Sequence, residues 1–202
     1  PFAFLVAILV IYRGFLNGVI PLMDKTEARY SEIARIMSET NNWITPQIDY
    51  GIPFWAKPPL STWLSGISMN IFGVNEFAVR FPYLVLNVIV VLLVGKYAKR
   101  KGLDFFIPGF ILLTIPEFLI HTGVVSTDTA LAFSVTLVML SFWEGINNSN
   151  NNYWKYLFFV GVGLGLLAKG PIIIILTGSP IFVWLIISRN FKHLWKSFPW
   201  IF

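Results

Sequence analysis

The chain has 202 residues, of which 56% are hydrophobic and only 12% are charged. Soluble domains carry about 25% charged residues, so this low share, together with long uncharged runs, places the chain in a lipid bilayer. The chain contains no cysteine, which excludes disulfides, thiolate metal sites and a catalytic thiol. The net charge of +5 is not carried by a basic run in a soluble domain, so we expect no nucleic-acid partner.

Six apolar segments approach the length of about 20 residues that a membrane-spanning helix needs. They lie at about Phe2–Ile20, Phe77–Gly95, Phe105–Ile120, Val124–Trp143, Tyr153–Ala168 and Pro171–Ile187. The shorter ones require tilt or local thinning of the bilayer. The predicted fold class is therefore an all-α polytopic membrane protein with about six transmembrane helices. Because the chain begins at Pro1 and stops at Phe202 inside an apolar stretch, we expect it to be a fragment of a longer protein.

Basic residues predict the orientation in the membrane. If the six segments alternate, the stretches near residues 96–104, 144–155 and 189–196 share one side. That side carries Lys96, Lys99, Arg100, Lys101, Lys155, Arg189, Lys192 and Lys196, against only Asp104 and Glu144. The positive-inside rule makes this side cytoplasmic. The outer side mixes acids and bases, chiefly in the loop Leu22–Trp63, and such mixed charge beside a membrane points to a functional site.

The outer loop is predicted to contain two helices that lie in the membrane interface and are joined by an extended segment. The first, Thr26–Glu39, places apolar residues on one face at helical spacing, and these are Tyr30, Ile33, Ala34 and Met37. The second, Pro59–Phe72, begins with proline in its first turn and stops before Gly73.

Asp24, Glu27 and Arg29 are the first candidates for chemistry in this loop. In the structural interpretation, Asp24 caps the helix and Glu27 completes a capping box three residues later. In the functional interpretation, a carboxylate acts as a general base, and Arg29 lies one turn away to bind a phosphate. The two interpretations are compatible, because a cap also fixes the geometry of the carboxylate.

Lys57 lies in a stiff segment, because Pro58 restricts its backbone to extended conformations and a second proline follows. We expect the ammonium to be held near the membrane surface beside Trp55 and Trp63. A lysine whose stem lies along apolar surface is the structural alternative, although that role does not require two consecutive prolines.

Further candidates lie at the outer ends of later spans. Asp128 begins the fourth span, where a carboxylate complements the helix dipole, with Ser126 or Thr127 as a cap. It faces the same compartment as Lys57, so the two can share a site. Lys169 occupies a short outer turn, where a membrane anchor is the alternative role. For Arg80 we favour a structural ion pair with Glu76, which lies four residues earlier. Glu117 and His121 are interpreted as packing or interfacial groups.

Several blocks occur in order along nearly the whole chain: Glu27-Ala28-Arg29-Tyr30, Trp55-Ala56-Lys57-Pro58-Pro59, Phe72-Gly73 followed by Glu76 and Arg80, and Ala168-Lys169-Gly170. Together they resemble the GT-C membrane glycosyltransferases that use polyprenyl-phosphate sugars. Within that group the chain is most similar to the lipid A aminoarabinose transferases and the protein O-mannosyltransferase superfamily. The resemblance implies that residues 1–202 are the N-terminal part of a GT-C transmembrane domain, with the catalytic outer loop at 21–76. Later spans and a soluble domain would follow.

The resemblance also implies roles for individual residues. Asp24 or Glu27, together with Asp128, would be catalytic, while Arg29, Lys57 and Lys169 would hold the lipid phosphate. The donor loop would include Tyr30, Trp55, Pro58 and Trp63. Many relatives have adjacent Asp and Glu where this chain has Thr26 and Glu27, so the choice between Asp24 and Glu27 as base stays open. Some relatives bind a metal through an acid at the position of Ala56. We therefore assign no metal or cofactor, and a divalent ion stays an open alternative.

The function implied is transfer of a sugar from a polyprenyl phosphate to a lipid or protein acceptor on the outer face of the inner membrane. Membrane lipids are the other expected partners. A secondary transporter or flippase component is the alternative, since ionisable residues in membrane proteins often mark transport pathways. Transporters place such residues near the bilayer midplane, whereas here they lie at loop and helix ends. A catalytically inactive membrane scaffold is the third alternative.

Overall fold

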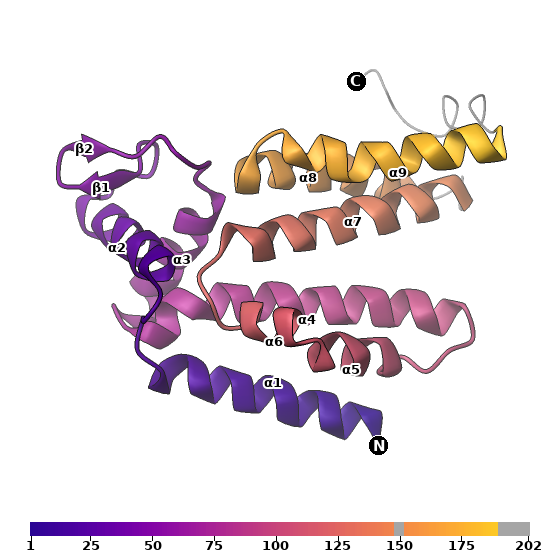
Figure 1. The fold of residues 1–202 in the computed structure, drawn as a ribbon, viewed down its shortest axis with the longest axis horizontal. Helices are drawn as coiled ribbons and strands as arrows, with labels where there is room; N and C mark the ends of the chain where they lie inside the picture. Colours follow the sequence, from indigo (N-terminus) through magenta and orange to yellow (C-terminus); the bar gives the residue numbers. More distant parts are fainter. Residues whose placement is uncertain (148–151, 190–202) are drawn as a thin grey trace.

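The computed structural model describes residues 1–147 and 152–189, and these form long helices stacked side by side with a smaller helical cap at one end (Figure 1). The helices are α1 (Phe2–Val19), α2 (Lys25–Thr40), α3 (Leu60–Phe72), α4 (Glu76–Arg100), α5 (Ile107–Thr114), α6 (Pro116–His121), α7 (Thr127–Asn147), α8 (Asn152–Lys169) and α9 (Ile172–Ser188). A short antiparallel hairpin, β1 (Gln47–Asp49) and β2 (Ile52–Pro53), completes the cap. Lys192 and Lys196, which contributed to the predicted orientation, lie outside the described residues.

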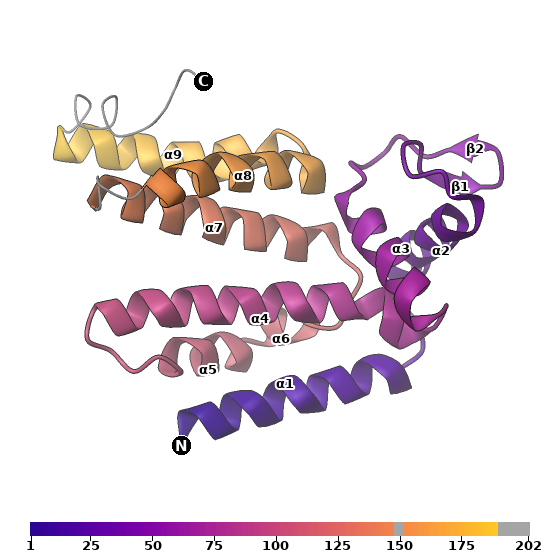
Figure 2. The ribbon, with the colours of Figure 1, turned by 180° about the vertical axis from the view of Figure 1, so that it is seen from behind.

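The long helices confirm the all-α polytopic membrane fold. Among the described residues, α1, α4 and α7 are long and apolar enough to cross a membrane, and α9 is a shorter apolar helix. The views from front and back agree that α7 lies between α4 on one side and the pair α8 and α9 on the other (Figures 1 and 2). The total of about six crossings stays a prediction.

The predicted span Phe105–Ile120 is not one continuous helix. It is divided into α5 and α6, which meet at Ile115 with ψ of 118°. Pro116 follows directly and disfavours the helical conformation for the residue before it. The chain therefore bends at this point, and α6 ends close to the cap.

The two predicted interfacial helices are confirmed as α2 and α3. α2 ends at Asn41, which adopts the left-handed conformation with φ of 53°, and α3 ends at Gly73 with φ of 80°. The apolar face predicted for α2 is buried against α3 and the start of α4, in a core that contains Tyr30, Ile33, Ala34, Met69, Val79 and Tyr83. This packing fixes the cap on the ends of the long helices.

The hairpin is tied to α2 by a surface network around Arg35. Its guanidinium donates to Glu32 at 2.6 Å and to Glu39 at 2.5 Å, and the Tyr50 hydroxyl donates to Glu39 at 2.5 Å. Gly51 takes the positive φ of 77° that the tight turn between the strands requires. The extended segment after α2 is therefore held in place from its first strand onward.

Candidate functional site

Asp24 is the N-cap of α2, as predicted. One carboxylate oxygen, Oδ1, accepts from the backbone N–H groups of Thr26 at 2.8 Å and Glu27 at 3.0 Å. These two hydrogen bonds lower the pKa of the exposed Asp24 carboxyl, because they stabilise its charged form. Among the described residues, the other oxygen, Oδ2, accepts no hydrogen bond. Asp24 is thus an oriented, ionised carboxylate with one free oxygen.

Glu27 points inward and forms a buried ion pair with Arg80. Arg80 Nε and Nη2 donate to the two carboxylate oxygens of Glu27 at 2.8 Å each, and both side chains are 4% exposed. The predicted capping box is therefore wrong in its second half, because the Glu27 side chain turns into the core. The predicted pairing of Arg80 with Glu76 is also wrong, because the guanidinium faces α2 across the packed interface.

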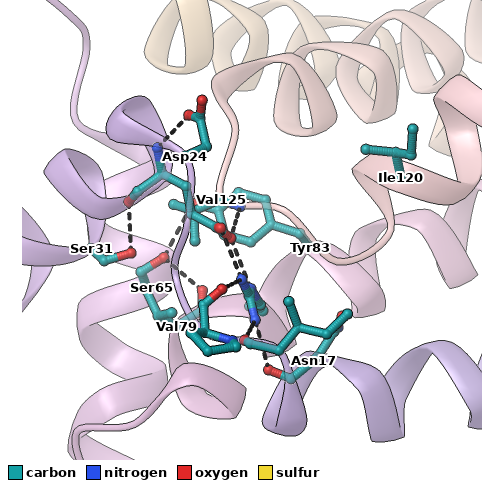
Figure 3. Close-up of polar contacts among 12 residues, drawn as sticks. Asn17, Asp24, Ser31, Ser65, Val79, Tyr83, Ile120 and Val125 are labelled. Carbon is teal, nitrogen blue, oxygen red and sulfur yellow. Dashed lines mark hydrogen bonds and ion pairs between the residues drawn. The ribbon is translucent and has the colours of Figure 1, made fainter.

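The same ion pair connects four segments of the chain. Arg80 donates to the backbone carbonyls of Asn17 and Pro21 at 3.1 Å each and also to that of Ile20, all at the end of α1 and just beyond it. Glu27 Oε1 accepts from the backbone N–H of Val125 at 3.2 Å, in the segment before α7. Figure 3 marks these contacts with dashed lines and labels Val125 and Asn17, which accept or donate at the two ends of the group. The end of α1, the starts of α2 and α4, and the segment before α7 are thereby held together.

A second set of contacts reinforces this junction from α1. Arg13 donates to the carbonyls of Leu119 at 3.1 Å and Ile120 at 2.9 Å, both in the last turn of α6. Gly123 lies so close to α1 that a Cβ at this position would stand 1.9 Å from Asn17 Oδ1. The connection from α6 to α7 therefore lies directly on α1.

A cavity of about 180 Å³ opens at this junction. It is lined by residues of α1, α2, α4 and the α6–α7 connection, and these include Arg13, Met23, Asp24, Glu27, Arg80 and Val124. Both candidate carboxylates of the first loop therefore face one small cavity, although only Asp24 has an unoccupied oxygen.

Arg29 and Lys57 are the two predicted phosphate-binding residues that carry unneutralised charge. Arg29 is exposed on α2 and Lys57 is half-buried in the loop before α3. Neither side chain has an acidic or hydrogen-bonding partner in the part of the chain that the structure describes. Two cations are thus available to an anion at the cap.

Asp128 and Lys169 come together from the ends of two helices. The Lys169 ammonium donates to Asp128 Oδ1, and Ser126 caps α7 by accepting from the backbone N–H of Asp128 at 3.0 Å. The Tyr30 hydroxyl lies within electrostatic reach of this pair. Its pKa is raised chiefly by burial and also by Asp128, while Arg29 and Lys169 act in the opposite direction. Asp128 and Lys169 therefore lie near enough to α2 to act electrostatically on the Tyr30 hydroxyl.

The segment that carries Lys57 is fixed at both ends. The Trp63 Nε1–H donates to the carbonyl of Trp43 at 2.6 Å, and the Tyr30 ring meets Phe54 edge-on with centroids 6.1 Å apart. Pro58 is half-buried just before α3, whereas Trp55 is 76% exposed. The segment that carries Lys57 is therefore rigid, and Trp55 projects from it away from the protein.

The sequence interpretation placed neither Arg80 nor Arg13 in this site, and it paired Arg80 with Glu76. The signal was present, since a charged side chain within an apolar span is costly unless it has a partner. Among residues 1–147 and 152–189, no three His, Cys, Asp or Glu side chains are grouped so that they can hold a metal ion. We therefore derive no step that involves a metal.

Comparison with known protein families shows to which family the chain belongs. The family described as dolichyl-phosphate-mannose-protein mannosyltransferase matches residues 3–202, which is nearly the whole chain. The chain belongs to this family. The resemblance inferred from the Glu27–Tyr30 and Lys57–Pro59 blocks is thus confirmed at the level of the GT-C glycosyltransferase superfamily.

Several relatives of this mannosyltransferase-family chain are named undecaprenyl phosphate-alpha-4-amino-4-deoxy-L-arabinose arabinosyl transferases. The protein from Wigglesworthia glossinidia brevipalpis is 28% identical over 192 residues, which cover 92% of this chain and 34% of that protein. The protein from Aeromonas salmonicida is 31% identical over 194 residues, which cover 89% of this chain and 34% of that protein. The chain thus spans about a third of the length of these relatives.

The fold also matches a solved member of the same group. The crystal structure of ArnT from Cupriavidus metallidurans bound to undecaprenyl phosphate superposes with a TM-score of 0.88 at 22% identity. The match covers 96% of this chain and 37% of that chain. This chain therefore has the fold of a part of ArnT that makes up 37% of that protein.

Proposed function

We propose that the protein containing this chain is a glycosyltransferase that moves a sugar from a polyprenyl phosphate to an acceptor at the outer face of the inner membrane. The observation that carries the proposal is the cap itself. It combines one oriented carboxylate, Asp24, with two cations that have no acidic partner among the described residues, Arg29 and Lys57. The names of the relatives support an undecaprenyl-phosphate-linked aminosugar as the donor.

The leaving group of this reaction is a lipid phosphate, and its charge requires cations near the bilayer surface. Arg29 offers a planar guanidinium that can hold two phosphate oxygens at once, and Lys57 offers a point charge on a stiff loop. When the bond between the anomeric carbon and the phosphate oxygen breaks, both electrons leave with the phosphate. Arg29 and Lys57 would stabilise that negative charge.

The attacking oxygen of the acceptor forms the new bond to the anomeric carbon and must lose its proton if it is a hydroxyl. We propose Asp24 as the group that receives this proton, because Oδ2 is unoccupied while Oδ1 is fixed by the helix N-terminus. Glu27 would then be a positioning residue, since both of its oxygens already accept hydrogen bonds. Asp128 and Lys169 would complete the site from the opposite wall.

The acceptor is proposed to be a lipid, with lipid A as the first candidate and a protein hydroxyl as the alternative. The outer face is proposed because the cap lies opposite the end of the bundle that carries the basic residues. The remaining two thirds of the relatives' length would supply further parts of the site, so the activity is proposed for the full-length protein.

The test is a transfer assay with the purified full-length protein, undecaprenyl phosphate-4-amino-4-deoxy-L-arabinose and either lipid A or an acceptor peptide. Asp24→Asn should lower kcat by about 10²- to 10⁴-fold, the usual contribution of a general base. Lys57→Gln should raise KM for the donor about tenfold or more, because one charge-assisted hydrogen bond to the phosphate is lost.

Two matched controls lie in the same loop. Asp49→Asn removes an exposed carboxylate in the hairpin, and Lys25→Gln removes an exposed cation next to Asp24. Both should retain full activity. Wild-type rates in Asp24→Asn and Lys57→Gln would refute the site assignment. Absence of transfer from every polyprenyl donor tried would refute the proposed function and favour a transporter or scaffold.

A further inference from the structure

The end of the helical bundle away from the cap carries a dense basic cluster. The last two turns of α4 and the residue after them contribute Lys96, Lys99, Arg100 and Lys101. In Figure 1 this end lies on the side opposite α2 and α3. Nothing in the proposed transfer reaction uses these residues.

A groove of about 350 Å³ opens beside this cluster, between the end of α4 and the helices α7 and α9. Its lining is apolar and aromatic and includes Tyr97, Met139, Leu140, Trp143, Ile181 and Trp184. The rings of Trp143 and Trp184 lie 6.1 Å apart and form one wall. The groove therefore offers an apolar slot that runs along the transmembrane helices.

Lys101 stands at the rim of this groove. Its ammonium lies 5.7 Å from the centroid of the Tyr97 ring and 5.9 Å from that of Trp143, and both rings line the groove. Such cation–π contacts hold a lysine head in place without neutralising its charge. Within the described residues, Lys101 has no acidic partner.

Arg100 next to it differs in this respect. Its guanidinium forms an ion pair with Glu144 and also lies over the Trp154 ring. Its charge is therefore compensated inside the protein. Lys101 borders the apolar groove, and its charge is available to an anion from outside the protein.

We propose that this groove binds an acidic phospholipid, with an acyl chain between α7 and α9 and the phosphate on Lys101. An apolar groove of about 350 Å³ with an uncompensated cation at its mouth is complementary to a lipid that carries one net negative charge. Basic pockets between transmembrane helices are known to accept anionic headgroups. Phosphatidylcholine, which is neutral overall, would fill the groove but gain little from Lys101, because its choline cation offsets the attraction between Lys101 and its phosphate.

The test uses the full-length protein, purified in mild detergent, stripped of lipid and titrated with phosphatidylglycerol or phosphatidylcholine of identical acyl chains. Bound lipid is counted by native mass spectrometry. Wild type should retain phosphatidylglycerol more tightly than phosphatidylcholine. Lys101→Gln should weaken phosphatidylglycerol binding about fivefold, the effect of one basic residue near a headgroup, and leave phosphatidylcholine unchanged.

Lys99→Gln is the matched control, since Lys99 belongs to the same helix end and, within residues 1–147 and 152–189, makes no ring contact that ties it to the groove. It should bind phosphatidylglycerol like wild type. Leu140→Trp should fill the groove and reduce retention of both lipids, with a thermal unfolding scan to check that it folds. Equal retention of the two lipids by wild type, or equal loss in Lys99→Gln and Lys101→Gln, would overturn the proposal. Neither result depends on whether the protein transfers sugar.

Discussion

Replacing Arg80 by leucine tests whether the buried ion pair holds the cap on the long helices. Leucine removes both bonds to Glu27 and leaves an unpaired carboxylate whose side chain is 4% exposed. Removal of one partner of a buried pair costs about 3–5 kcal/mol. Three backbone carbonyls at the end of α1 lose a donor as well, at about 1 kcal/mol each. We therefore expect α2 to detach at lower temperature than in the wild type.

The double variant Glu27→Leu, Arg80→Leu separates the unpaired charge from the loss of the contact itself. A buried pair replaced by apolar groups is often close to neutral in stability. Here the backbone N–H of Val125 also loses its acceptor, which costs about 1–3 kcal/mol. The double variant should therefore be more stable than Arg80→Leu but less stable than wild type.

The measurements are the thermal unfolding midpoint of the full-length protein in detergent, followed by tryptophan fluorescence, and the rate of proteolysis within residues 21–76. Arg35→Leu is the matched control, because it breaks an exposed network on the same helix and should cost about 1 kcal/mol or less. If Arg80→Leu is as stable as Arg35→Leu, the ion pair does not hold the cap. If the double variant is no more stable than Arg80→Leu, the unpaired charge is not the cause.

Three further predictions use the same unfolding measurement. Gly123→Ala should destabilise the protein by about 1–3 kcal/mol, because its Cβ would meet Asn17 Oδ1 at 1.9 Å. Gly163→Ala, whose Cβ would have open space around it, should be neutral or stabilising by up to about 1 kcal/mol. If Gly163→Ala destabilised the protein more than Gly123→Ala, the packing argument would be wrong. Trp63→Phe should cost about 1 kcal/mol and speed proteolysis of residues 43–58, because a loop carbonyl loses its donor; unchanged proteolysis would contradict this. The pKa of Asp24 is lower in the folded protein than in the unfolded chain. Its cap therefore stabilises the fold fully above about pH 3.9, the pKa of an aspartate in the unfolded chain. This stabilisation is lost as the pH falls through the pKa of Asp24 in the folded protein. The stability gap between wild type and Asp24→Ala should therefore be constant from about pH 8 to 5 and shrink below about pH 4; a gap that widens in acid would contradict the argument.

The helices of the outer loop were predictable because their signals are local. Asp24 caps α2, while Asn41 and Gly73 adopt the positive φ values that end α2 and α3. The buried face of α2 followed from apolar residues at helical spacing. Each of these features depends on a few neighbouring residues, so it can be predicted from the sequence without knowledge of the tertiary packing.

The ion pair that organises the site was not predictable by the same means. Arg80 has a local acidic neighbour in Glu76, and the i,i+4 rule favours that pair. Its real partner, Glu27, lies 53 residues away and is selected by the packing of α2 against α4. Pro116 was a local signal for the break between α5 and α6. The sequence interpretation did not use it, because it followed the apolar run, and hydropathy does not report backbone conformation.

The location of this ion pair also decides how the carboxylates of the cap divide their roles. A general base needs a free lone pair within reach of the acceptor, and Glu27 has committed both oxygens to Arg80 and Val125. Asp128 is paired with Lys169. Asp24 alone of the three has no cationic partner among the described residues, and its orientation depends on the helix that Glu27 anchors. Glu27→Gln should therefore lower transfer and stability together, whereas Asp24→Asn, whose side-chain oxygen can still cap α2, should lower kcat with little change in the unfolding midpoint. If Glu27→Gln instead lost activity at full stability, Glu27 would be the base.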